Sequence, residues 1–362
     1  MARDYENIID YVRTESDDFT TRAVCRVDSL VFSCLAYLRL PTDAHAAGDE
    51  EGLCLKDLFR LEWLDGMCGN LHDPQSSAEL LAAAAGSSRF KDVRVNSYVT
   101  HTDERAEQQF SAMTFSLSPH ETFVAFRGTD NTLVGWKEDF NMAFQHAIPS
   151  QIAATRYLER VAARTTGRIW CGGHSKGGNL AVYAGMTCPN EVAVRLARLF
   201  SHDGPGFLDE AMTQGRWSES STIVDKTIPQ SSVIGMLFEC QEPNYRVVRS
   251  HSVGFAQHDP FSWEVDGCDF VTESRVGLGA SLLDSSVNAW LVSTSPEERE
   301  RFVDAVFSVL GASGMATIGG IKRGWRTAVP KMLVAAAVLP EQDRKLVIDA
   351  AMDIVRLMAP PL

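Results

Sequence analysis

The sequence predicts an α/β fold in which a largely parallel sheet is covered by helices on both faces. From residue 93 onward, short apolar runs typical of strands alternate with longer helical patterns, which is the order of elements in a parallel sheet. One of these runs, Ile169-Trp170-Cys171, leads through a glycine-rich turn directly into a helical pattern of small residues. The 362 residues, 45% of them hydrophobic and 22% charged, are enough for one large globular core. We therefore expect a single domain over 1–362.

The predicted elements divide this domain into three segments, 1–92, 93–283 and 284–362. Helices are expected near residues 8–12 and over 28–38, and the polar stretch 41–92 is typical of a lid or of connecting helices. The middle segment is expected to hold a helix over 150–164 and strands at 93–98, 110–117, 122–126, 168–171, 197–202, 222–227, 245–250 and 263–265. The last segment is predicted as a run of helices with breaks at Gly311, Gly319-Gly320 and Pro330.

The glycine-rich turn carries the pattern Gly-x-Ser-x-Gly at residues 173–177, with Ser175 at its centre. A serine between a strand and a helix on so sharp a turn has its hydroxyl pushed into the open, and glycines on either side remove side chains that would clash. This is the nucleophile elbow of α/β-hydrolases, and the apolar strand before it and the helix start after it make the pattern specific. We therefore expect an α/β-hydrolase fold, with N-terminal helices and a C-terminal helical segment around the catalytic core.

Composition narrows the range of partners. The net charge of −13 argues against nucleic acid and against anionic membrane surfaces as main partners. The eight cysteines are scattered, with no Cys-x-x-Cys pair and no metal-ligand spacing, so they indicate no metal site. A serine mechanism needs neither a metal nor an organic cofactor, and none is expected. No stretch approaches the roughly 18 uninterrupted apolar residues of a membrane span, residues 332–339 being the nearest. The first residues do not have the pattern of a signal peptide, and we expect a cytoplasmic protein.

A serine nucleophile requires a histidine base, which should follow it in the chain order of this fold. Only His202, His251 and His258 come after Ser175. His202 ends a predicted strand directly before Asp203 and is expected to point away from that aspartate. His251 and His258 both lie in the loop after the last main strand, and the loop of His258, with a proline and a following strand, favours His258 as the base.

The acid that orients the histidine is predicted to be Asp203. It stands where an apolar strand meets a Gly/Pro turn, and ligands of open α/β sheets bind at such carboxyl strand ends. Asp225 is the rival, but its place within the next strand suggests an outward, solvated residue. Asp259 adjoins His258 and is too close in sequence to orient it. The other interpretation of Asp203 is a helix cap or a turn residue.

Two N–H donors should stabilise the oxyanion, one from the residue after the nucleophile and one from a loop after an early strand. The first is Lys176. The second is Thr129, which follows the predicted strand 122–126 and can offer both a backbone N–H and a hydroxyl. Arg127 is expected to brace this loop through a carboxylate, whereas Trp136 and Asp139 are interpreted as scaffold.

These motifs resemble those of class 3 lipases: residues 126–129, then Trp136 and Asp139, then 173–178. Residues 5–310 resemble more closely still the Mbeg-like family of bacterial lipase-like proteins, with shared stretches at 27–30, 203–207, 229–237 and 257–263. The resemblance to class 3 lipases implies that Ser175 is the nucleophile, that His258 is the base, and that Thr129 and Lys176 donate to the oxyanion.

The sequence departs from the class 3 pattern in two places. Those lipases usually place the acid at a position that aligns with Ser231-Ser232, where no carboxylate stands here. Either the acid has moved to Asp203, as in pancreatic-type lipases, or the triad is incomplete. Lys176 occupies a position that is often apolar in lipases, and it is expected either to tune the pocket toward acidic substrates or to be solvated.

The function predicted from these residues is that of a serine ester hydrolase, lipase- or esterase-like, which cleaves acyl esters or lipid-like small molecules through an acyl-Ser175 intermediate. Two other functions stay open at this point. One is a hydrolase fold used as a binding module with weak or absent activity. The other is acyl transfer, in which an alcohol or a thiol replaces water.

Overall fold

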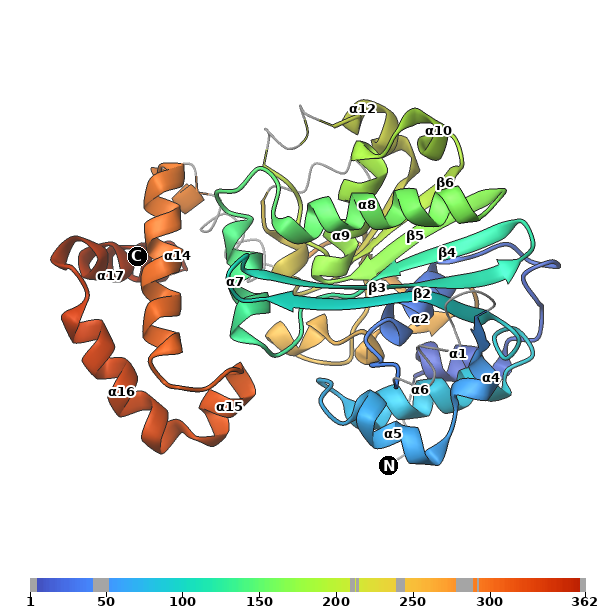
Figure 1. The fold of residues 1–362 in the computed structure, drawn as a ribbon, viewed down its shortest axis with the longest axis horizontal. Helices are drawn as coiled ribbons and strands as arrows, with labels where there is room; N and C mark the ends of the chain where they lie inside the picture. The colour runs from blue at the N-terminus through green and yellow to red at the C-terminus, as the bar shows by residue number, and fades with distance from the viewer. Residues whose placement is uncertain are drawn as a thin grey trace.

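A computed structural model describes residues 5–41, 52–208, 212, 215–238, 245–277, 289–291 and 293–358 (Figure 1). Its main feature is a nine-stranded sheet in the order β1-β2-β3-β4-β5-β6-β7-β8-β11 among the described residues. The strands are β1 (Leu53–Cys54), β2 (Arg94–Asp103), β3 (Gln108–Ser118), β4 (Glu121–Phe126), β5 (Arg168–His174), β6 (Leu196–His202), β7 (Val224–Pro229), β8 (Tyr245–Val248) and β11 (Thr272–Glu273). A separate small hairpin pairs β9 (Val265–Asp266) with β10 (Asp269–Phe270).

The central strands β4 to β8 run parallel to one another, whereas β1 to β4 form an antiparallel meander and β11 pairs antiparallel with β8. Parallel strands need crossover connections, and the helices between them cover the sheet. The predicted α/β-hydrolase fold, a mostly parallel sheet flanked by helices, is confirmed.

Helices cover both faces of this sheet (Figure 1). One face packs on α1 (Ile8–Thr14), α2 (Arg26–Leu35) and α6 (Pro74–Gly86), and the other packs on α8 (Pro149–Arg164) and α9 (Lys176–Thr187). Strand β4 shows how the sequence builds the two layers, because successive side chains point to opposite faces. Phe123 and Ala125 join the core under α2, whereas Val124 and Phe126 join the core under α8 and α9.

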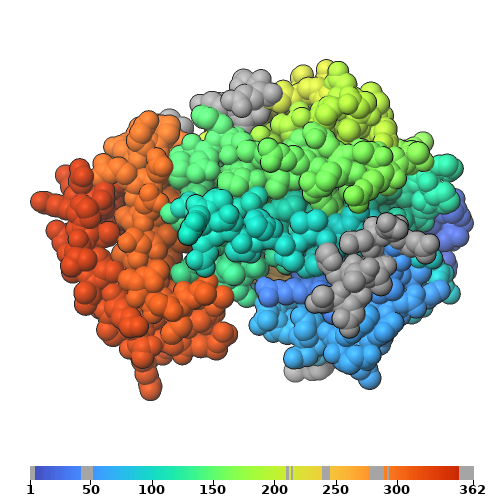
Figure 2. Space-filling view, viewed as in Figure 1, coloured from blue at the N-terminus to red at the C-terminus, as the bar shows by residue number. Residues whose placement is uncertain are grey.

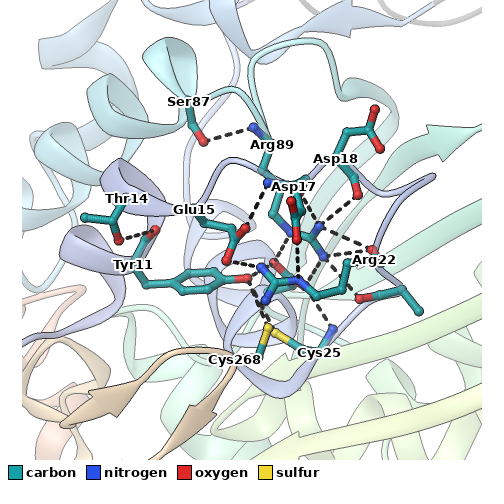
Figure 3. Close-up of polar contacts among 12 residues, drawn as sticks. Tyr11, Thr14, Glu15, Asp17, Asp18, Arg22, Cys25, Ser87, Arg89 and Cys268 are labelled. Atoms are coloured by element: carbon teal, nitrogen blue, oxygen red, sulfur yellow. Dashed lines mark hydrogen bonds and ion pairs between the residues drawn. The ribbon is translucent and has the colours of Figure 1, made fainter.

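The N-terminal helices are held by a buried arginine, Arg89. Its guanidinium pairs with the equally buried Asp28 of α2 at 2.6 Å. It also donates to the backbone carbonyl oxygens of Asp17 and Asp18 (Figure 3). A buried charge must be paired in this way, because desolvation would otherwise disfavour the fold. Helix α6, within the stretch predicted as a lid or connecting helices, is packed into the same core; residues 42–51 of that stretch lie outside the described residues.

Shorter helices connect these layers. They are α4 (Leu55–Leu58), α5 (Leu61–Cys68), α7 (Leu133–Asn141), α10 (Asn190–Ala193) and α12 (Trp217–Ser220), with 3₁₀ turns η1 (Ser221–Ile223), η2 (Ile234–Met236), η3 (Gly254–His258) and η4 (Pro260–Ser262). None of the described helices is long and apolar enough to cross a membrane.

The described part of the C-terminal segment includes α14 (Pro296–Gly311), α15 (Ile318–Arg323), α16 (Trp325–Val338) and α17 (Glu341–Met358), and α14 packs beside α7 (Figure 1). Helix α14 ends at Gly311 as predicted. The predicted breaks at Gly319-Gly320 and Pro330 are wrong, because the glycines lie within α15 and the proline lies within α16. Thr317 caps α15 through the Gly320 N–H at 2.9 Å. Pro330 is exposed, so water can hydrate the carbonyl of Arg326 that loses its helical donor.

His202 ends β6 and points into the layer under α2, away from Asp203, as predicted. Its Nε2 lies 2.9 Å from the Ser29 hydroxyl oxygen, and its ring stacks on Phe200. The residue is fully buried, and burial lowers the pKa of His202 to about 3. His202 is therefore a neutral core residue.

The buried His202 predicts a pH dependence of stability. Between pH 6.5 and 3 the His202 imidazole is protonated in the unfolded chain but stays neutral in the folded one. The contribution of His202 to the free energy of unfolding is therefore fully present above pH 6.5 and is lost as the pH falls toward 3. His202→Gln should remove up to about 1.4 kcal/mol per pH unit from that slope. Urea unfolding between pH 6.5 and 4 measures it, with the exposed His251→Gln as control. Parallel slopes for His202→Gln and the unmutated protein would contradict this assignment.

Candidate active site

The elbow at Ser175 lies between β5 and α9 in a strained backbone conformation. Ser175 has φ 58° and ψ −133°, a region that residues with a side chain rarely adopt. A Cβ on Gly177 would lie 2.1 Å from the Phe126 carbonyl oxygen, and one on Gly173 would lie 2.2 Å from Gly177. Both glycines are therefore required for the turn. The half-buried Ser175 stands at the carboxyl end of β5, with its N–H bonded to the His202 carbonyl at 2.9 Å.

Asp203 and His258 meet at this same edge of the sheet. Strands β5 and β6 pair His174 with His202, so Ser175 and Asp203 each follow directly on neighbouring strands. His258 ends η3, and its Nδ1 lies 2.6 Å from the Asp203 Oδ2. Asp203, fully buried at φ 51°, is held by its own N–H, which donates to the Thr227 carbonyl at 2.7 Å. The structure thus brings together the predicted acid and base one strand away from Ser175.

The other carboxylate oxygen of Asp203 is fixed by two donors. The Ser232 hydroxyl reaches Oδ1 at 2.5 Å, and the Gly235 N–H reaches it at 3.1 Å. A Cβ on Gly235 would lie 2.4 Å from Oδ1, so only glycine permits this approach. Ser232 is one of the two serines at the position where class 3 lipases place their acid. Its hydroxyl now supports a carboxylate that comes from another strand.

His174, the residue before Ser175, fixes the loop that carries His258. Its Nε2 lies 2.8 Å from the His258 carbonyl oxygen, which can only accept, so Nε2 carries the proton. The Nδ1 of the same ring lies 3.1 Å from the Tyr37 hydroxyl, which then donates to it. Burial lowers the pKa of His174 well below its usual value. The neutral His174 ring therefore connects Tyr37, which follows α2, to the backbone of His258.

The predicted oxyanion loop is braced by Asp139 of α7. The Thr129 hydroxyl donates to the Asp139 Oδ2 at 2.5 Å. Burial raises the pKa of Asp139 to about 6, although the Lys176 charge and the Thr129 hydroxyl bond act in the opposite direction. Asp139 is therefore more than scaffold, because it determines where the Thr129 hydroxyl proton points. Arg127 faces Asp130 at 3.6 Å, so its predicted role as a brace within the loop is confirmed.

The Lys176 side chain is buried beneath the elbow. Its Nζ lies 2.9 Å from the Glu138 Oε2, 2.9 Å from the Gln109 carbonyl oxygen and 3.1 Å from the Gln109 Oε1. A lysine has three N–H donors, and these three partners use them all. Both expectations for the Lys176 charge, solvation and the tuning of a pocket toward acidic substrates, are wrong, because the cation is neutralised inside the protein.

The remaining candidates have other partners. His251 is exposed and bonds the Glu264 Oε2 at 2.9 Å through its Nε2. Asp259 caps η4 through the Phe261 N–H at 3.1 Å. Asp225 was expected to be solvated, and this is wrong: it is 5% exposed and pairs with Arg26 at 2.8 Å and Arg198 at 3.0 Å. Two arginines from separate segments supply the compensating charge that allows its burial.

Several supporting residues were missed from the sequence, among them Glu138, His174, Ser232 and Gly235. Only Ser232 had a signal, its alignment with the usual acid position. The others contact the site through residues 32 to 84 positions away, which no local pattern reveals. Among the described residues, no group of three or more His, Cys, Asp and Glu side chains is placed to hold a metal ion.

Comparison with solved structures finds lipases. Lipase II from Rhizopus niveus is 13% identical over 68% of this chain and 86% of its own, with a TM-score of 0.34. M37 lipase is 12% identical over 57% of this chain and 68% of its own, with a TM-score of 0.35. A fungal lipase–inhibitor complex is 10% identical over 56% and 82% of the two chains, with a TM-score of 0.32.

No curated protein sequence matches the chain. The model of the Mbeg1-like family does, over residues 84–308. This match covers more than half of the chain and includes β3 to β8 together with Thr129, Ser175, Asp203 and His258. The resemblance seen in the sequence is confirmed, and the chain belongs to the Mbeg1-like family.

Proposed function

We propose that the protein is a serine ester hydrolase of lipase or esterase type, which cleaves acyl esters through an acyl-Ser175 intermediate. The observation that carries this proposal is the 2.6 Å contact between the His258 Nδ1 and the Asp203 Oδ2, directly beside the strained elbow of Ser175. A buried carboxylate on Nδ1 selects the tautomer in which Nε2 is free to act as a base.

In this mechanism, Ser175 Oγ attacks the ester carbonyl carbon and passes its proton to the His258 Nε2. The tetrahedral intermediate then collapses as His258 returns that proton to the leaving alcohol, which leaves an acyl-Ser175 ester. Water repeats the two proton transfers in the second half and releases the acid. Throughout, Asp203 keeps the imidazole oriented and stabilises its charged form, with Ser232 and Gly235 fixing the carboxylate in turn.

The oxyanion donors proposed are the backbone N–H groups of Lys176 and Thr129. Lys176 is the first residue of α9, where a helix leaves its N–H without an intrahelical acceptor. The Thr129 hydroxyl proton is already given to Asp139, so its hydroxyl sets the loop and its backbone does the binding. The buried charges of Lys176 and Glu138 hold both donors in place before the substrate arrives.

Apolar side chains near His258 favour acyl groups as substrates. The Phe255 ring lies 5.9 Å from the His258 ring and is 54% exposed, and Val253 in the same loop is 85% exposed. Exposed apolar side chains beside a catalytic base provide a surface for the hydrocarbon part of an ester.

Ser175→Ala should abolish the hydrolysis of p-nitrophenyl butyrate, because no other group can form the acyl intermediate. The change removes one small, half-buried oxygen and should alter stability by less than about 1 kcal/mol in urea unfolding. Ser218→Ala, an exposed serine, is the matched control and should hydrolyse the ester normally. Undiminished turnover by Ser175→Ala, or no turnover by the unmutated protein, would contradict the proposal.

Asp203→Asn should lower kcat for the same ester by up to about 10⁴-fold, because an amide no longer selects the correct imidazole tautomer. Asp259→Asn is the control in the same loop region, since that aspartate caps η4 and does not contact the His258 ring through a hydrogen bond; it should stay within a few-fold. Stopped-assay rates over a range of substrate concentrations separate kcat from KM. A nearly normal Asp203→Asn enzyme would show that Ser175 and His258 work without this acid.

Removal of a direct oxyanion donor lowers kcat by roughly 10²–10³-fold. Thr129→Val should lower kcat by much less than this. The reason is that the lost hydroxyl bonds Asp139, whereas the backbone N–H is retained. KM should change little. A loss of 10²-fold or more would show that the hydroxyl itself reaches the oxyanion, and an effect confined to KM would show that Thr129 only binds substrate.

A further inference from the structure

The C-terminal segment 305–340 has a charge opposite to that of the chain. It contains four of the 34 Lys and Arg residues, Lys322, Arg323, Arg326 and Lys331, and none of the 47 Asp and Glu residues. All four cations are exposed, and none forms an ion pair with a described residue. Among the described residues of an acidic protein, α15 and α16 therefore carry a group of four exposed cations without an ion-pair partner.

The same segment presents an apolar surface to solvent. Of the residues of α16 only Ala328 is buried. Exposed fractions are 57% for Trp325, 66% for Leu333 and Val334, and 76% for Val338. At 100° per residue Leu333 and Val334 lie on the side of the helix away from the buried Ala328, and Val338 lies at its flank. Helix α16 lies at the outer edge of the C-terminal helices (Figures 1 and 2).

Exposed aromatic and aliphatic side chains together with Lys and Arg are typical of helices that lie in a membrane interface. The apolar side chains enter the boundary of the acyl chains, while long cationic side chains reach the phosphates of the lipids. Tryptophan prefers this boundary, because its ring has an apolar body and a polar N–H. Cations that form no ion pair with a described carboxylate remain available to bind the anionic phosphates of such a surface.

We propose that α15 and α16 dock this protein on an anionic lipid surface. The helix lies on the surface and does not cross it, since its 14 residues are fewer than a span requires. The net charge of −13 argues against anionic membranes for the molecule as a whole, so docking depends on this one patch and weakens strongly with salt.

Docking would engage helices that are bonded to the loop of the proposed active site. The segment that leads into α15 pairs with the end of the oxyanion loop: the Leu133 N–H donates to the Ala316 carbonyl at 2.9 Å, and the Ile318 N–H donates to the Asn131 carbonyl at 3.0 Å. The docking helices are therefore tied to the loop that follows Thr129. This consequence rests on the proposed function, whereas docking itself does not.

The test is cosedimentation of the full-length protein with vesicles of phosphatidylglycerol and phosphatidylcholine, compared with vesicles of phosphatidylcholine alone. Binding should require the anionic lipid and should weaken at least tenfold in 0.5 M NaCl. Arg326→Gln with Lys331→Gln should weaken it by about 25-fold, at roughly fivefold per cation. The matched control, Arg105→Gln with Arg275→Gln, removes two exposed arginines elsewhere and should bind normally.

Leu333→Glu with Val338→Glu should weaken vesicle binding by more than about tenfold, because each apolar side chain contributes to insertion. Leu61→Glu with Val194→Glu changes two equally exposed apolar residues, 78% and 83% exposed, outside the segment and is the control. The Leu333→Glu, Val338→Glu variant should cleave the soluble p-nitrophenyl butyrate at the normal rate. Ser175→Ala should bind vesicles normally, so failure of docking and failure of the proposed function can be told apart.

Three results would overturn the proposal. The first is absence of binding to the anionic vesicles. The second is binding that the α16 variants leave unchanged. The third is a dimer in sedimentation equilibrium that the Leu333→Glu, Val338→Glu variant dissociates while vesicles capture neither form, because a second copy of the chain would then cover α16.

Discussion

The close contact between the backbone of Gly177 and the Phe126 carbonyl is the constraint on which the site depends. It brings the start of α9 against the end of β4, and this forces the positive φ of Ser175. It also places Lys176 next to the loop that begins at Arg127. The proposed nucleophile and both proposed oxyanion donors are therefore positioned by one packing contact, which a side chain at residue 177 would destroy.

Buried ion pairs and hydrogen bonds connect the elbow to helix α7 and, through it, to other parts of the protein. A lysine beneath the elbow would be costly without a partner, and Glu138 supplies one from α7 at 2.9 Å. The same helix provides Asp139 for Thr129, and its Lys137 pairs with Asp304 of α14 at 2.7 Å. Helix α7 thus connects the elbow, the proposed oxyanion loop and the C-terminal helices. Buried ion pairs often contribute little to the free energy of unfolding. We therefore interpret the Lys176–Glu138 pair as one that orients the elbow relative to α7.

Patterns in the sequence predicted the features of the site that depend on neighbouring residues or on the order of elements along the chain. The elbow needs only a strand, two glycines and a helix start, and the positions of Asp203 and His258 follow from where this fold places its loops. The burial and ion pairing of the Lys176 and Asp225 side chains were not predictable in this way. Lys176 is neutralised by a residue 38 positions away, and Asp225 by an arginine 199 positions away, so their burial could not be seen without the three-dimensional pairing. Pro330 was misjudged because its cost is reduced on an exposed helix face.

The central claim is that Ser175 is an activated nucleophile, and covalent labelling tests it most directly. A fluorophosphonate reacts with a serine only where a base removes the hydroxyl proton and donors stabilise the developing charge. The protein should be treated with the probe, digested and mapped by mass spectrometry. The account predicts a single stoichiometric adduct on Ser175 that denaturation before labelling abolishes. An unlabelled protein, or an adduct on another serine, would contradict it.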